Sequence, residues 1–188
     1  MKILSNGAWN TQNGNKHVYD AGLSTAIVDY AKRFECKLVY DFGCGMGSYA
    51  KALKESGFSV LAVDGNPHTP ELTNGIGLVQ DLSVPFLYPR VADLVLCLEV
   101  GEHIPAKFES VLLDNITKHS SNVVILSWAV PKQDGEGHVN CRPNQYIMDE
   151  MAKRGFSWHV KHSNEMRQSV TNAYWFKNTL MVFHRKTT

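Results

Sequence analysis

The sequence predicts an α/β fold built on a mostly parallel sheet. Short apolar runs that suit β-strands alternate along the chain with amphipathic runs that suit α-helices. Hydrophobic residues make up 44% of the chain and charged residues 20%, the balance of a globular protein with a sizeable core. No internal repeat, linker or low-complexity tract is visible, so we expect residues 1–188 to form one domain.

The predicted elements follow one another in a regular order. A helix covers residues 19–34, where apolar side chains recur on one side. Strands are expected at 38–42, 59–63, 76–79, 92–98 and 122–127, and helices at 49–56, 106–119 and 143–154. Two late strands, 157–161 and 179–184, close the sheet. Residues 1–18, rich in Asn and Gly, predict little structure of their own.

The most informative local feature is the run of residues 39–47. An apolar stretch reaches Asp41, glycines then occupy alternate positions, and a helix-forming run follows. A strand that passes into a helix through such a turn leaves backbone N–H groups unpaired at the helix start. Side chains at the glycine positions would keep a ligand away from the main chain. We therefore predict a small-molecule cradle formed by Gly43, Cys44, Gly45 and Gly47.

Two classes of cofactor are compatible with this cradle. A dinucleotide fingerprint, G-x-G-x-x-G, would need its third glycine where this chain has Ser48. The observed D-x-G-x-G-x-G pattern instead resembles motif I of the class I S-adenosylmethionine-dependent methyltransferases. That resemblance implies that Asp41 attracts the ammonium group of the methionyl moiety, directly or through water.

Further acidic residues follow the next apolar runs. Asp64, with Gly65 after it, ends the run 59–63, where a carboxylate can accept from both ribose hydroxyls. Dehydrogenases share this feature. The run 76–79 leads to Asp81, for which a turn cap is the alternative interpretation. The methyltransferase resemblance implies that Asp81 accepts from the adenine amino group and that the Leu82 N–H meets the ring.

Four acidic residues thus lie at the carboxyl ends of four successive predicted strands: Asp41, Asp64, Asp81 and Glu99. In open α/β sheets, ligands bind beyond the carboxyl ends of the strands. The order of elements resembles the seven-stranded, Rossmann-like class I methyltransferase sheet over nearly the whole chain. The resemblance implies mostly parallel strands, an antiparallel last strand, and helices on both faces.

The segment after the fourth strand, E-V-G-E-H-I, begins at Glu99. It resembles methyltransferases of small molecules, including ubiquinone-biosynthesis O-methyltransferases, and plant-type small-RNA 2′-O-methyltransferases. In those groups the two glutamates and the histidine bind a divalent metal, which implicates Glu99, Glu102 and His103, with His138 as a second histidine. Without a metal, Glu99 remains near the transferred methyl group, and His103 or His138 is the candidate base.

Two further segments are candidates for binding the acceptor. The polar loop 127–143 is long enough to be functional, and its residues His138, Asn140 and Arg142 alternate. Capping by Asn140 and a surface ion pair of Arg142 are the structural alternatives. Residues 1–18, including Trp9, are expected to form a lid or a wall of the acceptor site. Residues 174–176 are a second aromatic group that could line it or seal the core.

Composition narrows the setting and the partners. A net charge of +1 argues against strong non-specific binding to nucleic acid. No apolar run is long enough to span a bilayer. The four cysteines include no C-x-x-C pair, which favours a reducing, cytoplasmic setting without a disulfide framework. A monomer or homodimer is expected.

We therefore expect an S-adenosylmethionine-dependent methyltransferase that acts on a small polar acceptor, with oxygen as the expected atom. A metal-dependent RNA 2′-O-methyltransferase is one alternative. An NAD-dependent dehydrogenase and a non-catalytic nucleotide-binding regulator are the others.

Overall fold

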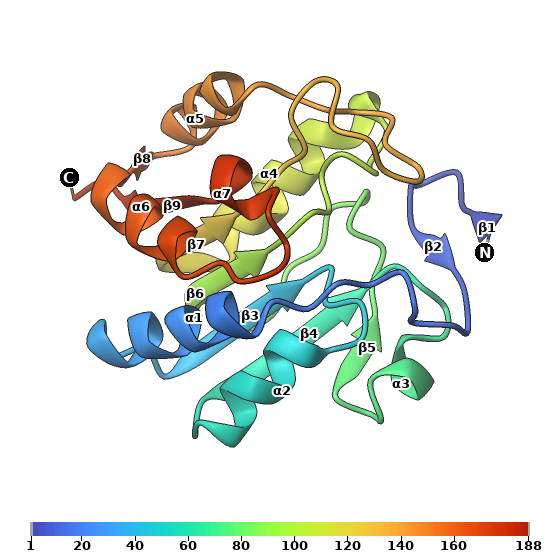
Figure 1. Ribbon diagram of the computed structural model, residues 1–188, viewed down its shortest axis with the longest axis horizontal. Helices are drawn as coiled ribbons and strands as arrows, with labels where there is room; N and C mark the ends of the chain where they lie inside the picture. Colours follow the sequence, from blue (N-terminus) through green and yellow to red (C-terminus); the bar gives the residue numbers. More distant parts are fainter. Residues whose placement is uncertain (1, 188) are drawn as a thin grey trace.

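A seven-stranded sheet organises the chain in the computed structural model, which describes residues 2–187 (Figure 1). The strand order is β5-β4-β3-β6-β7-β9-β8. The strands are β3 (Leu38–Phe42), β4 (Ser59–Asp64), β5 (Gly77–Val79), β6 (Ala92–Cys97), β7 (Ser120–Leu126), β8 (Phe156–Trp158) and β9 (Met181–Arg185). Strand β9 is antiparallel to both of its neighbours, and the other pairs are parallel. The predicted mostly parallel sheet with an antiparallel last strand is confirmed.

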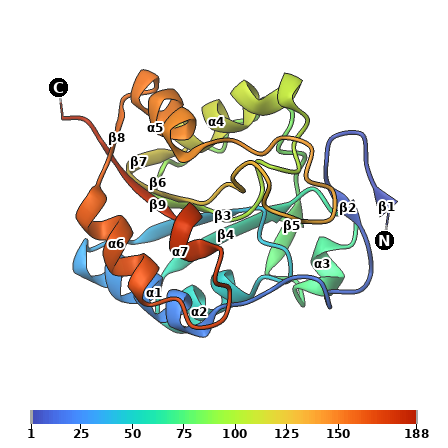
Figure 2. The ribbon, with the colours of Figure 1, turned by 45° about the horizontal axis from the view of Figure 1, so that its top comes forward.

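Helices cover both faces of this sheet (Figure 2). Helices α4 (Glu109–Lys118) and α5 (Asn144–Lys153) lie on one face, and a short 3₁₀ turn, η1 (Ala106–Phe108), precedes α4. Helices α1 (Ala21–Arg33), α2 (Ser48–Glu55) and α6 (Val160–Gln168) lie on the other. Two short helices, α3 (Thr69–Leu72) and α7 (Phe176–Thr179), flank the chain segments near β5 and β9.

The central strands are apolar on both sides because both faces are covered. Along β3, Tyr40 and Phe42 pack in the layer that holds α4 and α5, whereas Val39 packs in the layer that holds α1. All five residues of β3 are buried. Burial of each large apolar side chain contributes about 1.5–3 kcal/mol, so this double-sided core holds the strand ends in a rigid frame.

One prediction about local structure was wrong. The strand expected at 157–161 ends at Trp158, and helix α6 starts at Val160 because the Nδ1 atom of His159 accepts from the His162 N–H and caps the helix. Residues 1–18 were expected to have little structure of their own, and within the described part of this segment β1 (Lys2–Ile3) and β2 (Trp9–Asn10) form a short hairpin. A Cβ on Gly7 in this hairpin would lie 2.1 Å from the His103 carbonyl oxygen, so tertiary packing rather than local propensity orders the segment. Within residues 2–187 no helix has the length and apolarity to cross a membrane.

Candidate active site

A cavity of about 580 Å³ lies at the carboxyl ends of the parallel strands. It is lined by the N-terminal segment, the glycine turn, the residues that follow β4, β5 and β6, the loop after β7, and Trp175 with Phe176. Its volume is that of a typical small-molecule or cofactor site. The four acidic residues singled out from the sequence all line it: Asp41, Asp64, Asp81 and Glu99. The structure thus brings together side chains that are up to 58 positions apart in the chain.

In the glycine turn between β3 and α2, Gly43 and Gly45 have no room for a side chain. Gly43, Gly45 and Gly47 have φ angles of 81°, 53° and 70°, a region that favours glycine. A Cβ on Gly43 would lie 2.2 Å from Val100 Cγ2, and one on Gly45 would lie 2.4 Å from His17 Cδ2. The turn therefore needs glycine both for its backbone conformation and for the close approach of neighbouring side chains.

Cys44 and Gly65 also line the cavity. Cys44 is buried in a small cluster with Ala50 of α2 and Ala62 of β4, so its side chain packs rather than reacts. Burial, reinforced by the charges of Asp41 and Asp64, raises the pKa of the Cys44 thiol. Gly65 lines the cavity too, and a Cβ there would lie 2.6 Å from that of Ala8.

Asp41, which lines the cavity, has one carboxylate oxygen without a hydrogen-bond partner. Its side chain is only 3% exposed, and Oδ2 has no hydrogen-bond partner. Burial, with the negative charge of Asp64 as a second cause, raises the pKa of Asp41 to about 7. A cationic group bound beside it would favour the ionised form and satisfy the free oxygen. Asp41 therefore fits an ammonium ligand.

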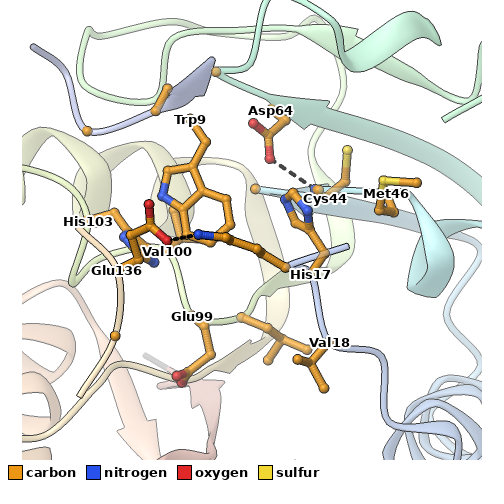
Figure 3. Close-up of a pocket in the computed structure, with 18 of the residues that line it drawn as sticks. Trp9, His17, Val18, Cys44, Met46, Asp64, Glu99, Val100, His103 and Glu136 are labelled. Carbon is orange, nitrogen blue, oxygen red and sulfur yellow. Dashed lines mark hydrogen bonds and ion pairs between the residues drawn. The ribbon is translucent and has the colours of Figure 1, made fainter. Parts of the chain in front are cut away.

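Asp64 and Asp81 are anchored by hydrogen bonds to the main chain. Asp64 Oδ2 accepts from Gly45 N at 2.9 Å, and Oδ1 accepts from Asn66 N at 2.9 Å (Figure 3). Asp81 Oδ1 accepts from both the N–H and the hydroxyl of Ser83, which is the turn role considered for it. Burial opposes ionisation of Asp81, but hydrogen bonds from Asn6 and Ser83 lower its pKa. Both carboxylates are held at the cavity wall, and the buried Leu82 lines it beside Asp81.

Glu99, which follows β6, has a strained backbone and an anchored side chain. Its φ of 52° is uncommon for a residue with a Cβ, and such strain is concentrated at functional sites. Its N–H donates to the Ser127 hydroxyl at 2.8 Å, and its Oε2 accepts from Gln133 Nε2 at 2.9 Å. Burial raises the pKa of Glu99. In Figure 3 its carboxylate extends away from Trp9 and His103.

Three other predicted residues meet at the cavity wall, where His103 and His138 line the cavity and Glu102 is buried beside them. Glu102, His103 and His138 each offer a ligand atom, and these atoms lie within 4.8 Å of one another. Glu102 is fully buried, and neither of its carboxylate oxygens has a hydrogen-bond partner. Burial, then the charge of Glu99, raises the pKa of Glu102 well above its usual value. Burial, then the neighbouring His138, lowers the pKa of His103 to about 4.

This group fits a divalent metal. Two imidazoles and one carboxylate are a donor set that transition metals accept. His138 Nδ1 lies 3.1 Å from the Gln133 carbonyl oxygen, which leaves Nε2, 4.0 Å from Glu102 Oε1, free to act as a ligand. Ligand histidines commonly have their second nitrogen held in this way. Glu99 is not part of the group, because Gln133 and Thr179 engage its carboxylate. Of the four residues predicted to bind a metal, the structure therefore brings three together in this group.

Some of the remaining candidate residues line the cavity, and others lie outside it. The N-terminal segment is a wall of the cavity: Trp9, His17 and Tyr19 line it, and an ion pair joins Lys16 to Glu136 of the opposite loop. Trp175 and Phe176 line it as well, whereas the Tyr174 side chain is exposed. Asn140 and Arg142 do not line the cavity; both donate to the carboxylate of Glu109.

Sequence reasoning overlooked Gln133. Its side chain donates to Glu99, and its main-chain carbonyl faces His138, so one residue contacts two candidate catalytic groups. A glutamine in a polar loop has no distinctive sequence pattern, and only the folded loop reveals the contacts. The Lys16–Glu136 pair was overlooked for the same reason, since 120 positions separate its members.

Comparison with protein families identifies residues 20–175 as a methyltransferase domain. The chain therefore belongs to this methyltransferase-domain family. Membership of this family favours a methyltransferase over a dehydrogenase, which transfers hydride. A comparison with curated protein sequences finds no significant match.

Solved structures share the fold at low sequence identity. The sugar N-methyltransferase KedS8 from Streptoalloteichus has a TM-score of 0.71 at 14% identity, covering 100% of this chain and 99% of its own. Magnesium protoporphyrin IX methyltransferase from Synechocystis, with bound S-adenosylhomocysteine, has a TM-score of 0.67 at 18% identity over 92% of this chain and 84% of its own. The amino pentose methyltransferase CalS10 from Micromonospora echinaspora has a TM-score of 0.67 at 13% identity over 92% and 94%. The fold is that of the class I methyltransferases.

Proposed function

We propose that this protein is an S-adenosylmethionine-dependent methyltransferase that acts on a small polar acceptor, with oxygen as the atom methylated. The observation that supports the proposal best is the buried Asp41 carboxylate, unpartnered at Oδ2, beside a glycine turn whose residues Gly43 and Gly45 line the cavity. The cofactor carries an ammonium group that would satisfy this oxygen. When bound, S-adenosylmethionine supplies an activated methyl group, so the protein needs chiefly to align the acceptor.

Each residue of the cradle has a role in this proposal. Gly43 and Gly45, which line the cavity, lie beside the methionyl part of the cofactor, and Asp41 holds its ammonium group. Gly47, which does not line the cavity, supplies the backbone conformation of the turn. Asp64 accepts from the ribose hydroxyls through lone pairs that its two main-chain bonds leave unused. Asp81 accepts from the adenine amino group through Oδ2, while the Leu82 N–H meets the ring.

Glu99, His103 and His138 are the proposed catalytic residues. Burial favours the neutral form of His103, so its imidazole is available to take the proton of an acceptor hydroxyl at neutral pH. A divalent metal held by Glu102, His103 and His138 would instead lower the pKa of a hydroxyl bound to it. The two arrangements differ in whether His103 acts as a base or as a ligand.

The charges of the wall favour a small acceptor over RNA. Among the described residues that line the cavity, Lys16 is the only lysine or arginine, and it is paired with Glu136. Recognition of a nucleic-acid backbone depends on several cationic contacts. The metal-fitting group is the one observation that favours an RNA 2′-O-methyltransferase, and it is compatible with a small acceptor as well.

Calorimetry with purified protein tests the proposal. Addition of S-adenosylmethionine or S-adenosylhomocysteine is expected to release heat with a 1:1 stoichiometry, and NAD is expected to give none. Transfer of a labelled methyl group to a panel of hydroxyl compounds, amines and a short RNA then identifies the acceptor class. Absence of binding by both adenosyl compounds would refute the proposal, and binding without transfer to any acceptor would favour a regulator.

A further inference from the structure

The loop that carries His138 is long and irregular, yet it is anchored at several points. Residues 127–143 connect β7 to α5 without a regular element. Immediately after His138, the N–H groups of Val139 and Asn140 both donate to the Glu102 carbonyl oxygen, at 2.8 and 2.9 Å. The buried indole of Trp128 donates to the Asn140 carbonyl oxygen at 2.6 Å. These contacts join the His138 side of the loop to the residue that offers the carboxylate of the metal-fitting group.

A buried carboxylate outside the cavity holds the same loop. Glu109, the first residue of α4, is 5% exposed. Its Oε2 accepts from Asn140 Nδ2 at 2.9 Å and from Arg142 Nε at 2.7 Å. Its Oε1 accepts from the hydroxyl of Tyr146 in α5. Three donors on two segments therefore converge on one carboxylate.

The placement of this carboxylate matters because buried polar groups are costly to leave unpaired. Arg142 supplies a charge-assisted bond, and its guanidinium also lies 4.9 Å from the centre of the Tyr146 ring. Loss of the Glu109 charge would leave the Arg142 guanidinium without its ion-pair partner, and the loop would adjust to satisfy it. Only one residue, Val139, separates Asn140 from His138, so a shift at Asn140 would be transmitted to the imidazole.

We propose that Glu109 is a positioning residue, which holds the loop 127–143 so that His138 faces Glu102 and His103. The inference rests on the proposed role of His138 in methyl transfer. Glu109 does not line the cavity, and it acts through Asn140 and Arg142. The loop of an otherwise common fold is thereby set by a side chain on a neighbouring helix.

The test is NMR of the full chain with isotope-labelled histidine, comparing the wild type with Glu109→Gln. Asp114→Asn is the matched control, because Asp114 is a carboxylate of the same helix whose partners, Lys118 and Arg154, lie outside the loop. In Glu109→Gln the His138 ring signals are expected to shift or broaden, and amide exchange at Val139 and Asn140 to accelerate by about tenfold or more. The signals of His162 and His184, far from the loop, are expected to stay in place and to report an intact fold.

Unchanged His138 signals and unchanged amide exchange in a folded Glu109→Gln variant would overturn the proposal. If Glu109→Gln loses its fold, which all histidine signals would reveal, Arg142→Gln decides: a smaller shift at His138 supports the proposal, and no shift overturns it. Calorimetry with S-adenosylhomocysteine on the same wild-type sample judges the proposed function separately. Failure of the wild type to bind is thus distinct from failure of Glu109 to position His138.

Discussion

The molecule has two clusters of histidines, and their hydrogen bonding differs. At the cavity, His103 and His138 lie beside Glu102, whose carboxylate oxygens have no partner. At the opposite end of the sheet, His162 Nδ1 lies 3.2 Å from both His184 Nε2 and the Tyr30 hydroxyl. The Tyr30 hydroxyl is also 2.7 Å from His184 Nε2. The histidines of the second cluster pair with one another and with Tyr30, whereas the first cluster includes polar atoms without a hydrogen-bond partner.

The difference indicates which cluster serves function. A buried polar group without a partner costs free energy, and in folded proteins such groups are concentrated where water, an ion or a ligand can pair with them. The far cluster instead joins α1, α6 and β9, and His159 stacks on His162 with ring centres 3.6 Å apart. Residue type alone does not distinguish these clusters, since histidine is prominent in both. The predictions below test the contrast, in order of decreasing effect.

The largest effect concerns metal binding. Calorimetric titration with Mn²⁺ is expected to show one site in the wild type, and Glu102→Gln to weaken it by about 100-fold or more, since a lost ligand costs more than a lost outer-shell partner. Glu99→Gln and His162→Gln are expected to retain the site. A site that persists in Glu102→Gln, or one that vanishes in Glu99→Gln, would contradict the three-ligand arrangement.

The next effect concerns the cofactor cradle. Asp64→Ala is expected to weaken binding of S-adenosylhomocysteine by about 1–3 kcal/mol, or roughly 5- to 150-fold, through the loss of charge-assisted bonds. Asp93→Asn is the control, because Asp93 also accepts from two main-chain N–H groups, those of Lys37 and Leu38, but lies outside the cavity. Equal affinities for Asp64→Ala and the wild type would remove Asp64 from the site.

The far cluster predicts a pH dependence of stability. Burial, together with the neighbouring His159 and His184, lowers the pKa of His162 to about 4 from its ordinary 6.5. The neutral imidazole therefore stabilises the fold above pH 6.5, and this contribution is lost as the pH falls towards 4. Between pH 6.5 and pH 4, the free energy of unfolding measured with urea is expected to fall by about 1–3 kcal/mol more in the wild type than in His162→Gln. Parallel pH profiles of the two proteins would show that His162 contributes nothing to the slope.

The smallest effect concerns the hydroxyl that completes the far cluster. Tyr30→Phe removes one buried hydrogen-bonding group and is expected to cost about 0.5–1.5 kcal/mol of stability. In thermal unfolding this corresponds to a fall in Tm of about 1–6 °C for a chain of this size. Affinity for S-adenosylhomocysteine is expected to be unchanged. A weaker affinity in Tyr30→Phe would mean that the two ends of the sheet are coupled.

Much of the frame could be predicted from the sequence because its signals are local. The largely apolar runs at 38–42 and 59–63 predicted β3 and β4 almost to the residue, since both strands pair in parallel with two neighbours inside the sheet. Short elements were less predictable: α7 contains only four residues, and the hairpin near Trp9 is ordered by packing against distant segments. Helix α6 begins inside the run 157–161, which was predicted to be a strand, because His159 caps the helix there.

By itself, the sequence determined the glycine turn and the acidic residue after each central strand, because both depend on neighbours within a few positions. Tertiary structure decided which of these groups keep free atoms. Gln133 and Thr179 engage Glu99 from other segments, and Glu109 holds the loop of His138 from a neighbouring helix. Such contacts join residues 31 to 80 positions apart, across which the chain carries no local periodicity. The free Glu102 carboxylate, and with it the division between a satisfied and an unsatisfied histidine cluster, exists only in the folded chain.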